Sequence, residues 1–150
     1  MAARKPPHIV EEKRAARAIA GRIRKGLIAY NVSKVGKPDY RRLVLSARDS
    51  AGRIVGGLTG ELYWNVLYVE LLWLKEGARE GGLGRRLMQE AEKRARRAGK
   101  DLIFLNTYTF QAPGFYRKLG FRSVGRIRNY PRGESRIFLV KKLFSRQDIR

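Results

Sequence analysis

The amino-acid sequence predicts a mixed α/β domain with a mostly antiparallel central sheet flanked by helices. Three features of the 150-residue chain predict this fold: a hairpin pattern over 41–62, a strand–helix–strand crossover over 65–107, and a final pair of strands over 121–143. Because 43% of the residues are hydrophobic, the chain can bury one core but not two. We therefore expect a single domain over residues 1–150, with a flexible start at 1–7 and a basic tail at 144–150.

The N-terminal part is predicted to contain one helix before the first strand. Residues 9–25 form a basic amphipathic pattern, whose apolar positions near one face are Ile9, Ala16, Ile19, Ala20 and Ile23. Residues 31–40 contain a glycine and a proline and are predicted to form a loop. Strands are expected at 41–48 and 53–62, since the Asp-Ser-Ala-Gly sequence between them is typical of a hairpin turn.

The remaining elements surround a long helix. The central strand is expected at 65–74, and a helix at 83–98 carries apolar residues every four positions with basic residues on the opposite side. Gly99 then ends this helix. The other predicted elements are a strand at 102–107, a short helix at 112–118, and strands at 121–128 and 135–143.

The turn between the central strand and the long helix has the composition of a phosphate-binding loop. It reads Arg79-Glu80-Gly81-Gly82-Leu83-Gly84, and its glycines lack the Cβ atoms that would hold a bulky anion away from the backbone N–H groups at the helix start. A Walker loop is excluded because Arg85 and Arg86 follow in place of Lys and Ser or Thr. A dinucleotide fingerprint is excluded because Leu87 occupies the position of its third small residue.

Two motifs of the chain resemble the GNAT superfamily of N-acetyltransferases. Arg79, Gly82 and Gly84 match its coenzyme A turn, Arg/Gln-x-x-Gly-x-Gly/Ala after a central strand. Residues 107–121, TYTFQAPGFYRKLGF, resemble the family segment in which a strand ends, a short helix carries a tyrosine, and Leu-Gly-Phe follows. The sequence IVGGL at 54–58 is similar to the strand before the central strand. The resemblance implies a GNAT fold that uses acetyl-CoA as co-substrate, without a metal.

The resemblance also implies how acetyl-CoA is bound. Backbone groups of Leu72, Trp73 and Leu74 would pair with the pantetheine arm as an added strand, and a backbone N–H there would polarise the acetyl carbonyl. Main-chain N–H groups of the turn would hold the diphosphate. The residues of this cradle are Glu80, Gly81, Gly82, Leu83, Gly84 and Arg85.

Further cofactor contacts are expected from the segment after the fourth strand. Lys118 or Arg117 follows the tyrosine and can reach the adenosine phosphate. Thr109 stands where many relatives carry an asparagine that bonds to the pantetheine arm. This departure leaves open whether Thr109 makes the contact or whether Asn106 or Gln111 replaces it.

Two side chains are candidates for proton transfer. Tyr116 matches the family's general acid, and its phenol can donate a proton to a departing thiolate, although packing under the cofactor is an alternative role. Glu70 is the candidate base: an apolar strand around it would raise its pKa, whereas an ion pair with an arginine is the alternative. Glu70, Tyr68 and Leu72 have the same parity and are expected on one face of the strand. His8 is expected to be solvated.

Composition bounds the partners of the chain. It has no cysteine, so an acetyl-cysteine relay is excluded and direct attack in a ternary complex is expected. No apolar run is long enough for a membrane span or secretory signal, which makes the cytoplasm the expected compartment. The net charge of +21 has two possible roles: it keeps the protein soluble, or it allows weak binding of RNA or another polyanion.

These observations predict an acetyl-CoA-dependent N-acetyltransferase acting on a primary amine. Two alternatives are an acetyltransferase that docks RNA-linked or protein substrates on its basic surface, and a non-catalytic nucleic-acid-binding module. The sequence leaves the acceptor amine open, and a homodimer is left open as well.

Overall fold

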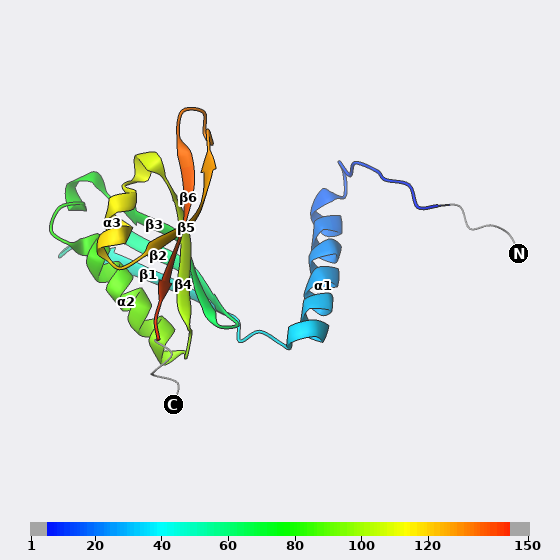
Figure 1. Ribbon diagram of the computed structural model, residues 1–150, viewed down its shortest axis with the longest axis horizontal. Coiled ribbons are helices and arrows are strands. Elements are labelled where there is room, and N and C mark those ends of the chain that lie inside the picture. The colour runs from blue at the N-terminus through cyan, green and yellow to red at the C-terminus, as the bar shows by residue number, and fades with distance from the viewer. Residues whose placement is uncertain (1–5, 145–150) are drawn as a thin grey trace, which may run out of the picture. The chain divides into compact units, whose positions relative to one another are not determined.

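A computed structural model describes residues 6–144 of the protein (Figure 1). Residues 1–5 and 145–150, which contain most of the predicted flexible start and basic tail, lie outside the described residues. The chain divides into two compact units, Met1–Pro38 and Asp39–Arg150. Within the described residues, no helix is both long and apolar enough to cross a membrane.

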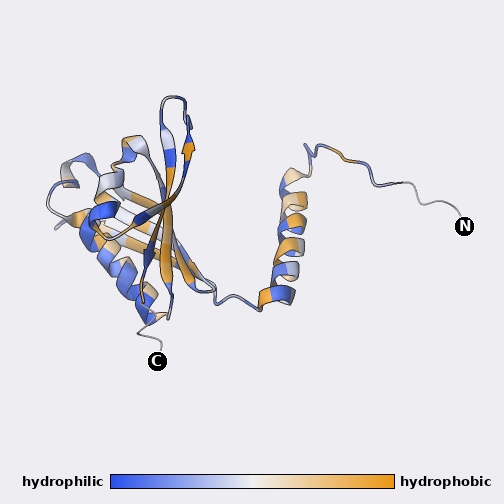
Figure 2. Cartoon of the chain, viewed as in Figure 1, coloured by the Kyte–Doolittle hydropathy of each residue, from blue (hydrophilic) through white to orange (hydrophobic). Residues whose placement is uncertain are grey.

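The first unit contains one helix, α1 (Ala16–Val35). The prediction of a helix at 9–25 and a loop from residue 31 was wrong at both ends. Between Ala16 and Val35 there is no proline, and the helix continues until Gly36, which has a φ of 82° and donates its N–H to the carbonyl of Val32. The stop signal is therefore the glycine itself, which adopts the left-handed φ that helix ends favour. No residue of α1 is buried, and orange apolar and blue polar positions alternate along it (Figure 2).

The second unit contains a six-stranded sheet. Its strands lie in the order β1-β2-β3-β4-β6-β5, and β3 and β4 are the parallel pair in an otherwise antiparallel sheet. The bounds are β1 (Arg41–Arg48), β2 (Ile54–Tyr63), β3 (Val66–Leu74), β4 (Leu102–Tyr108), β5 (Arg122–Arg128) and β6 (Ser135–Lys142). This arrangement confirms the predicted mixed, mostly antiparallel fold with one crossover.

Helix α2 (Leu83–Arg97) makes that crossover and covers one face of the sheet (Figure 1). Its Met88, Ala91 and Ala95 pack into a core with alternate residues of the strands, among them Leu67 and Leu105, which are at most 1% exposed. The outward side of α2 is blue in Figure 2, as the charged side of an amphipathic helix should be. The remaining elements are α3 (Pro113–Lys118) and two 3₁₀ turns, η1 (Glu76–Ala78) and η2 (Thr109–Gln111).

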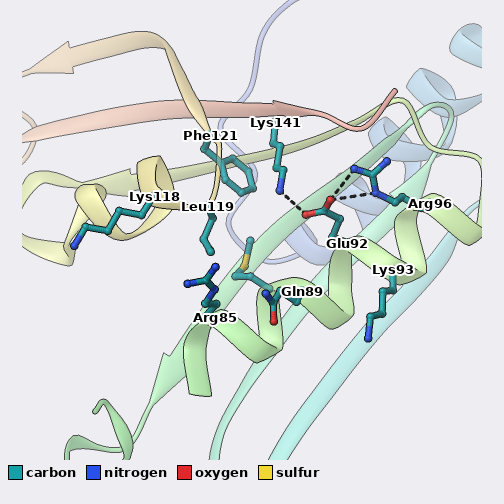
Figure 3. A pocket seen from close by; sticks show the side chains of 10 residues that line it. Arg85, Gln89, Glu92, Lys93, Arg96, Lys118, Leu119, Phe121 and Lys141 are labelled. Atoms are coloured by element: carbon teal, nitrogen blue, oxygen red, sulfur yellow. Dashed lines mark hydrogen bonds and ion pairs between the residues drawn. The ribbon is translucent and has the colours of Figure 1, made fainter. Parts of the chain in front are cut away.

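A partly buried ion-pair cluster joins α2 to β6 (Figure 3). The Nζ of Lys141 lies 2.6 Å from Glu92 Oε2, and Arg96 Nη2 lies 2.8 Å from Glu92 Oε1. Burial, the largest influence, raises the pKa of Glu92, but the hydrogen bonds and charges of Lys141 and Arg96 outweigh it, so the pKa lies below its ordinary 4.5. The carboxylate therefore stabilises the fold only while it is ionised.

We expect Glu92→Gln to lower the free energy of unfolding by about 1–3 kcal/mol at pH 7, because hydrogen bonds to charged groups are lost and Lys141 keeps no carboxylate. A lowered native pKa stabilises above the unfolded-state pKa near 4.5, and this contribution disappears as the pH falls through the native value. Urea unfolding at pH 7 and at acidic pH measures both effects. Glu90→Gln is the matched control, since its exposed i,i+4 pair with Arg94 contributes little. Equal effects of the two variants would contradict the role of the cluster.

Candidate active site

The parallel strands β3 and β4 pair over only part of their length. Their register runs from Val66 opposite Leu102 to Val69 opposite Leu105 and ends there, although β3 continues to Leu74 and β4 to Tyr108. A cavity of about 740 Å³ lies where the pairing ends. Its wall is formed by the second half of β3, the glycine turn, the start of α2, the end of β4 and α3.

Leu72, Trp73 and Leu74 present one edge of β3 to this cavity. They pair with Leu58, Gly57 and Gly56 of β2 on their other side, and in residues 6–144 no strand pairs with them on the cavity side. Backbone donors and acceptors at such an edge can accept an extended ligand as an additional strand.

The glycine turn forms the start of α2. Gly81 and Gly82 have φ values of 102° and 75°, and Gly82 is the N-cap of α2 without any side-chain cap, so the first N–H groups of the helix are left to a ligand. A Cβ added at Gly82 would meet no atom within 4 Å. The turn therefore keeps its backbone accessible to an anion on the cavity wall.

Gly84 has a different role from the one its motif suggests. A Cβ at Gly84 would lie 3.3 Å from side-chain atoms of Leu74 and Phe115. Gly84 therefore permits close packing of α2 against β3 and α3, while Gly82 faces open space. Four of the predicted cofactor-binding residues in this segment line the cavity: Arg79, Gly82, Gly84 and Arg85. Three others do not line it: Glu80, Gly81 and Leu83.

Tyr116 lies on α3 at the cavity wall. Its half-buried ring packs edge-on against Phe115 and Phe121, with centroid separations of 5.0 and 5.9 Å. Burial raises the pKa of its phenol above the ordinary 10.0, because the charged form would be poorly solvated. Its hydroxyl makes no hydrogen bond within residues 6–144, and since no buried side-chain N or O atom there lacks a partner, the hydroxyl is accessible and can donate to a ligand.

Glu70 also lines the cavity, but the prediction that Glu70, Tyr68 and Leu72 share one face was wrong for Leu72. The register shifts so that Thr59 pairs with Leu71 and Gly60 with Val69, which leaves Glu70 unpaired in a β-bulge. After this extra residue, Leu72 packs against the core beside α2. Tyr68 lies on the opposite face, where it stacks on Phe104. Tyr68 and Leu72 therefore do not share a face.

The carboxylate of Glu70 points to the face away from α2 and forms an ion pair. Its Oε2 lies 3.0 Å from Arg42 Nη2 and accepts a hydrogen bond from the hydroxyl of Thr59 at 3.4 Å. The ion pair left open by the sequence is thus present. It holds the carboxylate at the bulge, beside the cavity, and leaves its second oxygen for other partners.

Thr109 is directed away from the cavity. Its hydroxyl donates to the carboxylate of Glu134 and accepts from the backbone N–H of Ser135 at 3.0 Å. Asn106 and Gln111 do line the cavity. Gln111 Oε1 also accepts the N–H of Tyr108 at 3.1 Å, which closes the turn η2.

A second cavity of about 500 Å³ adjoins the first and shares Arg85, Lys118 and Leu119 with it. Figure 3 shows Lys141 and Arg96 directed at Glu92 and Arg85 and Lys118 at the other end of this cavity. Arg96 and Lys141 also line this cavity and were not predicted as site residues from the sequence. One face of α2 forms a wall of this cavity through residues spaced three or four apart: Arg85, Gln89, Glu92 and Arg96. This spacing could have indicated Arg96 from the sequence. No local pattern indicates Lys141, which comes from β6.

An accessible strand edge, an uncapped helix start behind a glycine turn, and a phenol at the same cavity suit an acyltransferase that uses a phosphorylated thioester. The chain belongs to the acetyltransferase (GNAT) family, whose model matches residues 9–121. It is therefore an acetyl-CoA-dependent acetyltransferase, and acetyl-CoA is its co-substrate.

Known proteins resemble the chain in sequence and in structure. A blasticidin-S acetyltransferase of Streptomyces morookaense is 46% identical over 93 residues, which cover 61% of this chain and 68% of the relative. An acetyltransferase of Bacillus cereus superposes with a TM-score of 0.85 at 34% identity and covers 91% of this chain and 98% of its own. A Bacillus anthracis acetyltransferase in complex with acetyl coenzyme A has a TM-score of 0.62 at 25% identity, over 77% of this chain and 68% of its own.

Proposed function

We propose that the protein transfers the acetyl group of acetyl-CoA to a primary amine by direct attack in a ternary complex. The cavity where β3 and β4 separate carries this proposal, because it brings together an accessible strand edge, Tyr116 and Glu70. The sequence contains no cysteine that could carry the acetyl group as an intermediate thioester. Holding both substrates in one geometry then supplies much of the acceleration.

The proposed binding of acetyl-CoA follows the cavity wall. The pantetheine arm adds to the edge of Leu72–Leu74, and the diphosphate lies on the backbone of the turn at Gly82 and at the start of α2. Arg85 and Lys118, which line both cavities, supply positive charge for the phosphates. Gln111 makes the polar contact to the arm through its side-chain N–H groups, because the hydroxyl of Thr109 is engaged by Glu134 and Ser135 and both amide atoms of Asn106 are engaged by Arg136 and Tyr68.

The proposed chemical step begins with the free amine. Its lone pair attacks the acetyl carbonyl carbon, whose oxygen is polarised by a backbone N–H of β3. Glu70 accepts the proton that the amine loses, directly or through one water. The carbon–sulfur bond then breaks, the amide remains on the acceptor, and the phenol of Tyr116 protonates the thiolate of coenzyme A.

A panel of acceptors, assayed by release of the coenzyme A thiol, tests the proposed function. Blasticidin S is the first small amine to include, because the relative with 46% identity is named for it. Peptides with a free N-terminus, lysine peptides and aminoacyl-RNA test the alternative that the net charge of +21 serves a macromolecular substrate. Turnover only with the peptides or the aminoacyl-RNA would show that the acceptor is a macromolecule and not a small amine. No turnover with any amine would contradict the proposed function.

We expect Glu70→Gln to lower the rate by about ten-fold or more at neutral pH, because the amine must then lose its proton to solvent. The remaining activity should rise with pH as the amine itself deprotonates. Rate profiles against pH, with a good acceptor, provide the measurement. Arg42→Gln is the matched control, since it breaks the same ion pair but keeps the carboxylate. If both variants lose activity equally and keep the parent profile, Glu70 acts only through its ion pair.

A further inference from the structure

Arg136 on β6 is held by three aromatic rings. Its guanidinium carbon lies 5.6 Å from the centroid of Tyr108, 6.0 Å from that of Tyr130 and 5.7 Å from that of Phe138. Its Nε donates to Asn106 Oδ1 at 2.8 Å. Ring faces attract a cation without neutralising it, so these contacts fix the position of the guanidinium and leave its charge intact.

Within residues 6–144, this arginine has no carboxylate partner. In the described part of the chain, residues 6–144, no acidic side chain lies within 4.0 Å of Arg136, although the side chain is half-buried. Arg42, also on this face of the sheet, is paired with both Glu61 and Glu70. The terminal N–H groups of Arg136 form a planar fork that suits a carboxylate, and the described structure supplies no acceptor for them.

The position of Arg136 relates it to the proposed reaction centre. Asn106, its hydrogen-bond partner, lines the cavity and follows directly after Leu105, the last β4 residue paired with β3. Glu70 follows directly after Val69, the last β3 residue of that pairing. Asn106 also donates to the hydroxyl of Tyr68 at 3.4 Å, which places this network on the sheet face away from α2. A carboxylate at the cavity wall and a guanidinium bonded to the cavity-lining Asn106 thus lie on the same face of the sheet, near the point where the strands separate.

We propose that Arg136 binds a carboxylate of the acceptor, so that the acceptor is an amine that also carries a carboxylate. Its amine lies toward Glu70 and its carboxylate forms a bidentate pair with the Arg136 fork. This inference rests on the proposed transfer to a primary amine and names the chemical class of that amine. Asn106 is then a positioning residue, because it orients the guanidinium through the bond to Nε.

The test compares paired acceptors that differ only in this group. Glycine, β-alanine and γ-aminobutyrate are assayed beside their carboxamides, and kcat/KM is measured for the parent protein and for Arg136→Gln. We expect the variant to lose about ten-fold or more on the carboxylates, mainly through KM, and to change little on the carboxamides. Comparing the variant with the parent for each acceptor cancels the different basicities of the amines. Arg136→Lys should be intermediate, since it keeps the charge but not the fork.

Two further variants serve as a control for the loss of one positive charge and as a second test of Arg136. Arg126→Gln removes one positive charge from the exposed neighbouring strand β5 and should leave both kinds of acceptor unaffected. Asn106→Asp gives Arg136 an internal carboxylate while its ring contacts remain, so it should lose selectivity for carboxylates even if Arg136→Gln folds poorly. Thermal unfolding and acetyl-CoA affinity show whether each variant is intact.

The outcomes separate this inference from the proposed function. Equal losses on carboxylates and carboxamides, or turnover confined to amines without a carboxylate, would overturn the role of Arg136 and leave amine acetylation standing. If no amine is turned over, the proposed function fails, and calorimetric titration of the same acceptors with coenzyme A present still decides about Arg136. A preference for carboxylates that disappears in Arg136→Gln supports the site, and equal binding of both kinds overturns it.

Discussion

Replacing Tyr116 with phenylalanine should lower turnover by about ten-fold to a thousand-fold while acetyl-CoA binds as before. The substitution removes the hydroxyl but keeps the ring that packs against Phe115 and Phe121, so the wall of the cavity stays in place. Since burial raises the pKa of the phenol above 10.0, the tyrosine of the parent protein keeps its proton at neutral and mildly alkaline pH. Its function as an acid should be lost only as the pH rises through that raised value.

Steady-state rates with a good acceptor, together with calorimetric affinity for acetyl-CoA, measure this effect. Tyr63→Phe is a suitable control, because it removes a hydroxyl from β2 at a position outside the cavity. Full turnover in Tyr116→Phe would reduce Tyr116 to a packing residue. A loss confined to acetyl-CoA affinity would instead assign it to cofactor binding.

Among the substitutions considered, adding a side chain at Gly82 should lower the affinity for acetyl-CoA most. In Gly82→Val the added atoms project into space that is empty in the protein and that the proposed diphosphate occupies. The residue also has a φ of 75°, which a β-branched residue adopts poorly, so the turn itself is strained. We expect affinity for acetyl-CoA to fall by about a hundred-fold or more, the equivalent of losing roughly two charge-assisted hydrogen bonds.

Gly52→Val is the matched control for strain. Gly52 has a φ of 78°, and a Cβ there also meets nothing within 4 Å, but it lies in the β1–β2 turn outside the cavity. Both variants should lose similar stability in thermal unfolding, while only Gly82→Val should lose acetyl-CoA binding in calorimetric titration. Parent-like affinity in a folded Gly82→Val protein would remove the glycine turn from the proposed site.

The strands β1–β6 and the helices α2 and α3 were predicted within one residue at each end, whereas the turns η1 and η2 were not predicted. Their signals are local: alternation of apolar residues in β2, four-residue spacing in α2, and glycines at the turns. The glycine turn was found in the same way, because a helix start without side chains can be read from consecutive residues. The start of α1 at Ala16 could not be read so directly, since its helical pattern is weak and no side chain caps its first turn.

The roles of single site residues depended on contacts between distant segments. The bulge at Glu70 is a property of the pairing between β2 and β3, and it reverses which residues of β3 face the core, so parity along one strand could not foresee it. Thr109 is engaged by Glu134, which is 25 residues away in the sequence. The proposed role of Arg136 depends on its contacts with three aromatic rings and with Asn106, which come from other segments of the chain.

The sequence by itself therefore determined the fold class, the family and the co-substrate, because each depends on residues close together along the chain. The tertiary structure alone decided that Leu72 does not share the face of Glu70, what engages Thr109, and that Arg136 has no carboxylate partner within residues 6–144 while it is bonded to the cavity-lining Asn106. The physical reason is that strand register and side-chain partners are set by packing between segments, for which a single sequence carries no local signal.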